Sequence, residues 1–161
     1  MRKYIILHLE DSKNDSELIK RQLIRSNLNI DYFWVYNKYS YIRALSELNP
    51  DVILCDHDLP QFNAPMALEI FKEMNINIPF ILVTGNVSEE YAVDMIKNGV
   101  DDYILKDRIS RLPLSIEMAL EKKRIEKEKN EAIKKLKENE ERFRLILKGS
   151  TDSYWDWDIE N

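Results

Sequence analysis

The chain is poor in cysteine, glycine and histidine. Its 161 residues include one Cys, three Gly and two His. The single cysteine, Cys55, excludes an intramolecular disulfide, and its place inside an apolar segment favours a buried, unreactive thiol. With His8 inside another apolar segment, a histidine-based metal or acid–base site is not favoured. We expect His57 to be an exposed loop residue.

Long hydrophobic runs are also absent from the sequence. No segment has the ~18–20 consecutive apolar residues that a transmembrane helix needs. The opening residues Met1, Arg2 and Lys3 lead into a short apolar segment rather than the core of a signal peptide. These absences predict a cytoplasmic protein without a membrane partner. The net charge of −5 gives no reason to expect nucleic acid as a partner.

Strand-like and helix-like segments alternate through the first two thirds of the chain. Short apolar segments predict strands at 4–9, 31–36, 51–55, 78–83 and 103–105. Amphipathic segments predict helices at 15–27, 40–48, 64–74 and 88–98, the third with Met66, Ile70 and Met74 four residues apart. This alternation favours an α/β fold with parallel strands and right-handed crossovers. We expect a flavodoxin-like, doubly wound five-stranded sheet of order 2-1-3-4-5.

Polar residues follow four of the five predicted strands. Glu10 and Asp11 follow the first, Asp56 the third, Thr84 the fourth and Lys106 the fifth. Because the carboxyl ends of parallel strands share one edge of the sheet, we expect these residues to converge there. Three neighbouring carboxylates need a counter-charge, since each raises the pKa of the others. A divalent cation with oxygen ligands, best Mg²⁺, fits this requirement.

These five positions, each at a strand end and in this order, resemble the receiver domain of two-component response regulators. The resemblance extends from residue 2 to about residue 121. It includes Pro60, four residues after Asp56, and Tyr103, three residues before Lys106. It implies a phosphoacceptor domain that acts as a switch rather than as an enzyme. The implied partner is a histidine kinase or a phosphotransfer protein.

The resemblance implies which residues carry the phosphorylation chemistry. Asp56 would be the nucleophile that takes a phosphoryl group from a phosphohistidine in a Mg²⁺-dependent reaction. The side chains of Glu10 or Asp11 and of Asp56 would hold the cation, together with the backbone carbonyl of Asp58. Asp58 also adds an acid two residues after Asp56. Its side chain would either orient a hydrolytic water or repel the phosphoryl group, and the sequence leaves both roles open.

The resemblance also implies which residues bind the phosphoryl group. Lys106 would pair with its oxygens, Thr84 would donate its hydroxyl, and backbone amides near His57 and Gly85 would add donors. Tyr103 would turn inward as Thr84 moves toward the phosphate. The chain departs from the family where Lys106 is followed by Asp107 instead of proline, which puts a cis peptide at that bond in doubt. The loop at 61–65 also lacks the usual glycine.

Two other functions compete with the receiver interpretation. Asp56, His57 and Asp58 also resemble the nucleophile motif of haloacid-dehalogenase-type phosphatases, with Asp101 and Asp102 as later metal ligands. In that family the lysine precedes the late acidic pair, whereas Lys106 follows it, and Glu10 and Asp11 would have no role. A phosphorylation-silent interaction module is the third hypothesis. The complete set of five polar positions argues against it.

The chain changes character from Leu112 onward, where Glu, Lys and Arg dominate and glycine is absent until Gly149. This composition predicts one long helix, with residues 122–148 as a linker between domains. Its candidate coiled-coil seam alternates steps of four and three and consists of Met118, Lys122, Ile125, Lys129, Ala132, Leu136, Asn139, Phe143 and Ile146. The seam predicts a homodimer through this helix. A single solvated helix is the alternative.

The last segment, 149–161, is rich in aromatic and acidic residues, among them Tyr154, Trp155 and Trp157. Together with residues 140–147 it resembles the opening helix and first strand of a PAS sensory domain. Its alternating pattern predicts a half-buried strand. We therefore expect a fragment of a longer protein, by analogy a hybrid histidine kinase first and a cyclic-dinucleotide enzyme second.

Overall fold

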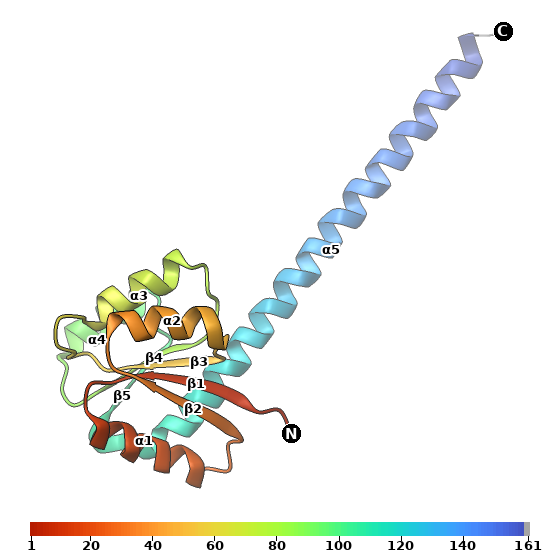
Figure 1. Cartoon of the computed structure of the whole chain (residues 1–161). Coiled ribbons are helices and arrows are strands. Elements are labelled where there is room, and N and C mark those ends of the chain that lie inside the picture. Colours follow the sequence, from red (N-terminus) through yellow and green to blue (C-terminus); the bar gives the residue numbers. More distant parts are fainter. Residues whose placement is uncertain (160–161) are drawn as a thin grey trace. The chain divides into compact units, whose positions relative to one another are not determined.

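The protein is an α/β domain followed by helix, as seen in the computed structural model, which describes the backbone of residues 1–159 and the side chains of residues 1–150 (Figure 1). The strands are β1 (Tyr4–Leu9), β2 (Ile30–Val35), β3 (Val52–Cys55), β4 (Phe80–Thr84) and β5 (Asp102–Leu105). The helices are α1 (Lys13–Arg25), α2 (Lys38–Leu48), α3 (Ala64–Glu73), α4 (Glu89–Lys97) and α5 (Leu112–Ile159), with a short 3-10 helix, η1 (Lys106–Arg111), before α5. All strand pairs are parallel, in the order β2-β1-β3-β4-β5. This confirms the predicted sheet.

Each face of the sheet has its own hydrophobic core, because alternate strand residues point to opposite faces. In β3, Ile53 and Cys55 pack with side chains of α2, α3 and α4, whereas Val52 and Leu54 pack with side chains of α1 and the first turns of α5. Helices therefore cover both faces (Figure 1). The buried positions of α3 are Ala64, Ala67, Leu68 and Phe71. Met66 and Met74, which the helical spacing grouped with Ile70, are exposed.

Asparagine takes the left-handed backbone positions that glycine usually fills. Asn27, Asn49 and Asn75 have φ values of 64°, 48° and 54° and follow α1, α2 and α3. Asn tolerates this region because its short side chain bonds locally to the backbone. Only α4 ends on a glycine, Gly99, with φ of 110°. The asparagines explain how a chain with three glycines can end several helices with a residue of positive φ.

A polar side chain caps the N-terminus of each of the first four helices. In α1 the Ser12 hydroxyl accepts a hydrogen bond from the Asp15 amide at 3.2 Å, so the helix begins at Lys13 rather than at the predicted Asp15. The other caps are Asn37, Asn63 and Ser88. Caps satisfy orphan amides at helix starts. The Ser12 cap also places the first turn of α1 beside the end of β1.

The prediction of a strand after Gly149 is wrong for the residues that the structure describes, because α5 continues through Gly149 to Ile159. A single strand without a neighbour leaves its backbone amides and carbonyls unpaired, whereas a helix pairs them within the segment. Residues 160–161 of the predicted PAS-like segment lie outside the described residues. By its internal contacts, the chain divides between Lys123 and Arg124. The domain bounds at 121 and 148 stay predictions.

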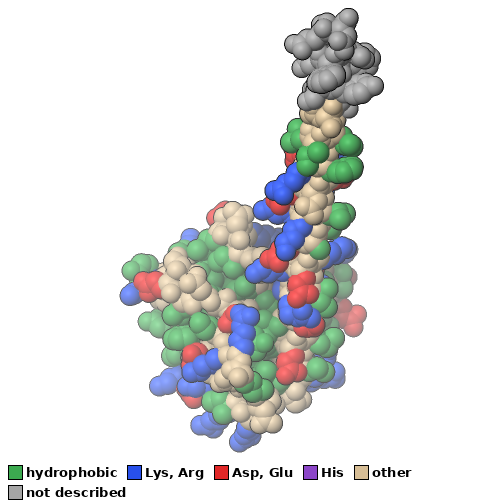
Figure 2. Space-filling view, turned by 90° about the vertical axis from the view of Figure 1, so that its right-hand side faces the viewer, with side chains coloured by type: hydrophobic (Ala, Val, Ile, Leu, Met, Phe, Trp, Pro, Cys, Tyr) green, Lys and Arg blue, Asp and Glu red, His purple; other side chains and the backbone are tan. Residues whose placement is uncertain are grey.

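The predicted seam of α5 is exposed to solvent in the single chain. Met118, Ile125, Leu136, Phe143 and Ile146 expose 52–71% of their surface. Hydrophobic side chains lie along this helix among charged ones (Figure 2). A helix apolar and long enough for membrane insertion is not found among the described residues.

Candidate functional site

The predicted acids converge at the carboxyl ends of β1 and β3. These strands are neighbours, with Leu9 opposite Cys55, so Glu10 and Asp56 emerge side by side. One carboxylate oxygen from each of Glu10, Asp11 and Asp56 lies within 4.8 Å of the others. Glu10 and Asp56 are buried, and Asp11 is exposed. The sequence prediction of a three-carboxylate cluster is confirmed as geometry.

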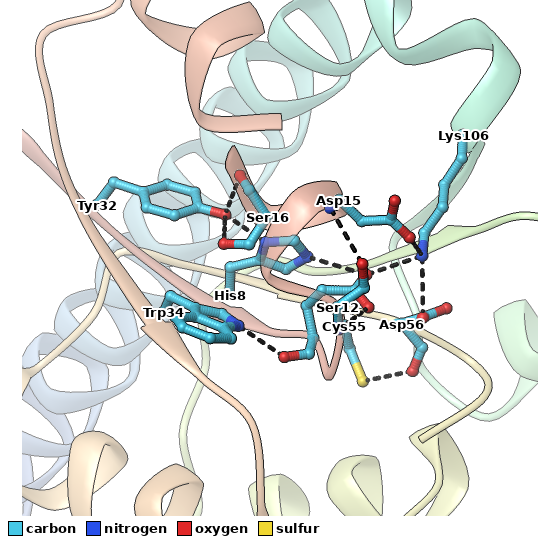
Figure 3. Close-up of polar contacts among 10 residues, drawn as sticks. His8, Ser12, Asp15, Ser16, Tyr32, Trp34, Cys55, Asp56 and Lys106 are labelled. Carbon is cyan, nitrogen blue, oxygen red and sulfur yellow. Dashed lines mark hydrogen bonds and ion pairs between the residues drawn. The ribbon is translucent and has the colours of Figure 1, made fainter. Parts of the chain in front are cut away.

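The ammonium group of Lys106 points toward Asp15 and Asp56 (Figure 3). Its Nζ is 2.8 Å from Glu10 Oε2 and 3.0 Å from Asp56 Oδ2. A third partner, Asp15 Oδ2, lies at 2.7 Å. Burial alone would lower the pKa of Lys106, but the ion pairs with Asp15, Glu10 and Asp56 raise it above its ordinary value. The lysine therefore stays charged and offsets part of the negative charge.

Sequence reasoning missed Asp15 as a site residue and assigned it only to a helix start. Its place in the first turn of α1 brings its carboxylate to Lys106, 91 residues away in the sequence. The sequence indicated this role only through the position of Asp15, four residues after Asp11 and in the first turn of the predicted helix. The structure thus adds a fourth acid to the strand-end site.

Three groups hold Glu10 in place. Its Oε1 accepts a hydrogen bond from the Ser12 amide at 3.0 Å, and its Oε2 faces Lys106. Its backbone carbonyl accepts a hydrogen bond from the Trp34 indole at 2.6 Å. Burial raises the pKa of the Glu10 carboxyl, while Lys106 and the Ser12 amide act in the opposite direction. A cation at this position would relieve the cost of the buried charge.

Behind Glu10 lies a buried hydrogen-bond network of His8, Tyr32 and Ser16 (Figure 3). The Tyr32 hydroxyl donates to the Ser16 carbonyl at 3.1 Å and contacts the Ser16 hydroxyl at 2.9 Å and His8 Nδ1. On the other side of the ring, His8 Nε2 lies 4.0 Å from Glu10 Oε2. Burial lowers the pKa of His8 to about 3, so the ring is neutral.

The predicted phosphate and switch residues come from the two strands beyond β3. Thr84 ends β4, is buried, and pairs with Leu105, the residue before Lys106. Tyr103 in β5 is 36% exposed and lies at the surface. At Gly85, an added Cβ would meet no atom within 4 Å, so the space beside this backbone is open. The described peptide bonds include no cis peptide, Lys106–Asp107 among them.

The prediction that His57 is exposed is wrong. Its side chain is 24% exposed, and its ring packs on that of Tyr91 with centroids 4.2 Å apart. Tyr91 lies in α4, 34 residues later in the sequence. The residues around His57 therefore did not indicate that its ring would be partly buried by Tyr91. Asp58 is 87% exposed, with Oδ1 3.5 Å from His57 Nε2. The predicted role of the Asp58 carbonyl stays a prediction.

The late acids of the phosphatase hypothesis have other roles. Asp101 Oδ2 accepts a hydrogen bond from the Phe80 amide at 2.8 Å and so holds the start of β4. Asp102 Oδ2 accepts one from the Ser115 hydroxyl at 2.6 Å and ties β5 to α5. Neither belongs to the carboxylate cluster. The structure therefore does not bring the late acids of the phosphatase hypothesis into a cluster with Asp56.

Comparisons with known proteins show the family of the first unit of the chain. A family model described as the response regulator receiver domain matches residues 6–117. The regulatory protein LuxO of Vibrio cholerae is 27% identical over 115 residues, which is 71% of this chain and 25% of that protein. The luminescence regulatory protein LuxO of Vibrio campbellii is 30% identical over 125 residues, 77% of this chain and 27% of that protein. The chain thus spans about a quarter of the length of these curated relatives.

Solved structures show the same fold. The receiver domain of a LuxO repressor protein from Vibrio parahaemolyticus superposes with a TM-score of 0.71 at 24% identity, covering 78% of this chain and 96% of that chain. The receiver domain of the Francisella response regulator 1452 superposes with a TM-score of 0.66 at 26% identity, covering 74% and 98%. The matches therefore describe the first unit of the chain.

The buried, neutral His8 predicts how stability depends on pH. The unfolded chain protonates this histidine below its ordinary value of 6.5, but the folded chain does so only near 3. The unfolded state therefore binds one more proton in that window, so the contribution of His8 to stability falls with falling pH. The fall is at most about 1.4 kcal/mol per pH unit.

Urea unfolding of wild type and His8→Leu at several pH values checks this expectation. The variant should lose less stability than wild type between pH 6.5 and pH 4.5. Ile6→Val, a buried change without a titrating group in the same strand, should keep the wild-type pH dependence. Equal pH dependence in wild type and His8→Leu would contradict a buried neutral histidine.

Proposed function

Because the chain belongs to the response regulator receiver family, whose members are phosphoacceptors in two-component signalling, we propose that Asp56 is its phosphorylated residue. The observation that carries this proposal is the contact of 3.0 Å between Lys106 Nζ and Asp56 Oδ2 within the acidic cluster. Asp56 lies at the end of the central strand β3 and is buried. Asp56 thus combines a cation partner with two neighbouring carboxylates, and its place after β3 matches the phosphoacceptor position that the family resemblance implies.

The acidic cluster fits Mg²⁺, which prefers oxygen ligands and keeps several waters. Glu10 and Asp11 would hold the ion together with Asp56, and the backbone carbonyl of Asp58 would add a fourth oxygen. One lysine cannot neutralise four nearby carboxylates, so the site favours a divalent cation. Bound Mg²⁺ would offset negative charge on the carboxylates and on the phosphoryl oxygens.

The reaction is a phosphoryl transfer from a donor phosphohistidine to Asp56. A carboxylate oxygen of Asp56 attacks phosphorus, the P–N bond breaks, and its electron pair returns to the imidazole nitrogen of the donor. Lys106 then binds a phosphoryl oxygen, and the Thr84 hydroxyl donates to another. The amides near His57 and Gly85 supply further donors. Tyr103 turns inward as Thr84 moves.

In this proposal the domain is a signalling switch rather than an enzyme with turnover. Its partner is a histidine kinase or phosphotransfer protein, and its location is the cytoplasm. Residues 1–121 form the receiver, 122–148 a helical linker, and 149–161 the start of a PAS-like module. Phosphorylation of Asp56 would act as a switch, because an acyl phosphate changes the charge beside Lys106 and Thr84 together.

The Asp56→Asn variant tests the phosphoacceptor directly. Wild type incubated with Mg²⁺ and acetyl phosphate should gain one labile phosphoryl group, visible by intact mass, because the carboxylate is the nucleophile. Asp56→Asn should gain none. Asp94→Asn, which makes the same chemical change at an exposed acid on α4, should be phosphorylated like wild type. A labile adduct on Asp56→Asn would contradict the assignment.

We also propose that α5 forms a homodimer through the seam of nine residues defined in the sequence. The apolar seam positions are exposed in the single chain, and burying them is the main gain available to a long amphipathic helix. Polar Lys122, Lys129 and Asn139 in the seam weaken the pairing but fix its register.

Light scattering of the full chain tests this proposal. The full chain should have the mass of a dimer, and a fragment ending at Glu121 should be a monomer. Leu136→Lys should dissociate the dimer because it places a charge in the seam. Glu141→Lys introduces the same residue away from the seam and should leave the dimer intact. A monomeric full chain would overturn the proposal.

A further inference from the structure

Three carboxylate oxygens crowd the Lys106 ammonium, two as hydrogen-bond acceptors, Asp15 Oδ2 and Asp56 Oδ2, and one as an ion pair, Glu10 Oε2. An ammonium group has three donors, and the contacts to Asp15, Glu10 and Asp56 are 2.7, 2.8 and 3.0 Å. A phosphoryl oxygen on Asp56 therefore competes with these carboxylates for Lys106. Which carboxylate leaves decides how readily the site is phosphorylated.

Of the three carboxylates that contact Lys106, Asp15 is the one outside the proposed Mg²⁺ site. The acids that lie close enough to share a cation are Glu10, Asp11 and Asp56, and Asp15 is outside this group. Its side chain is 40% exposed, whereas that of Glu10 is fully buried. When Lys106 leaves Asp15, water can therefore solvate the Asp15 carboxylate, and the free-energy cost of breaking this ion pair is low.

The fold holds Asp15 against Lys106 through the cap of α1. The Ser12 hydroxyl accepts a hydrogen bond from the Asp15 amide, and the Ser12 amide donates a hydrogen bond to Glu10 Oε1. One residue thus fixes both carboxylates that flank the lysine (Figure 3). A carboxylate in the first turn is also favoured by the helix dipole. The contact is part of the resting structure and does not depend on a flexible loop.

We propose that Asp15 is a positioning residue that holds Lys106 in the resting state and competes with the phosphoryl group for it. This inference rests on the proposed phosphorylation of Asp56. As the phosphoryl group forms its bond with Asp56, Lys106 leaves Asp15 and binds a phosphoryl oxygen. The Asp15 carboxylate also repels the arriving phosphoryl dianion. Both effects oppose phosphorylation. Asp15 therefore lowers the rate of phosphorylation of Asp56 and raises the concentration of phosphodonor that the reaction requires.

The test compares variants of Asp15 in the full chain with acetyl phosphate at saturating Mg²⁺. Asp15→Asn and Asp15→Ala should raise the second-order rate of acyl phosphate formation about five-fold, the size of a partly exposed ion pair. They should also bind beryllium trifluoride, a non-reacting mimic of the phosphoryl group, more tightly by a similar factor. Asp15→Glu restores the carboxylate and should return both values toward wild type.

Glu17→Gln is the matched control, because it removes one negative charge from an exposed position on the same helix. It should leave the rate and the affinity unchanged. Rates of both Asp15 variants equal to or below wild type would overturn the inference, as would an equal rise in Glu17→Gln. Wild type that gains no phosphoryl group at all would instead refute the proposed function.

Discussion

Four carboxylates and one lysine share the carboxyl edge of the sheet, and this imbalance of charge governs the site. Glu10, Asp15 and Asp56 all contact Lys106, and Asp11 stands beside them. Like charges this close are stable only with counter-charges and hydrogen-bond donors. The fold supplies one fixed cation and the Ser12 amide. The remaining negative charge is what a divalent cation would neutralise, and it makes the site responsive to a charged modification.

The parallel sheet makes this convergence possible. Its strand order places β1 beside β3, so acids 46 residues apart in the sequence leave the sheet together. Two side chains of the edge strand β2 form hydrogen bonds near these acids. The Trp34 indole donates to the Glu10 carbonyl, and the Tyr32 hydroxyl contacts the Ser16 hydroxyl. The hydrogen bonds of these aromatic side chains tie the end of β1 to β2 and the Tyr32 hydroxyl to α1. Site geometry and core packing therefore depend on the same strands.

The strand-end residues could be predicted from the sequence because a parallel sheet brings the ends of all its strands to one edge. Asp15 and Trp34 could not, since their contacts depend on the rotation of α1 and on the register of β2 against β1. His57 was predicted exposed because its cover, Tyr91, comes from a distant helix. The strand predicted after Gly149 is wrong for the described residues because α5 continues to Ile159, which pairs the backbone groups within the helix.

The central claim is that Lys106 changes partners when Asp56 is modified. A crystal structure of the full chain with Mg²⁺ and beryllium trifluoride measures this most directly. We expect beryllium bound to an Asp56 oxygen, Mg²⁺ held by Asp56 together with Glu10 or Asp11, and Lys106 Nζ on a fluoride instead of on Asp15. An adduct on another carboxylate, or an Asp56 adduct with Lys106 still on Asp15, would contradict it.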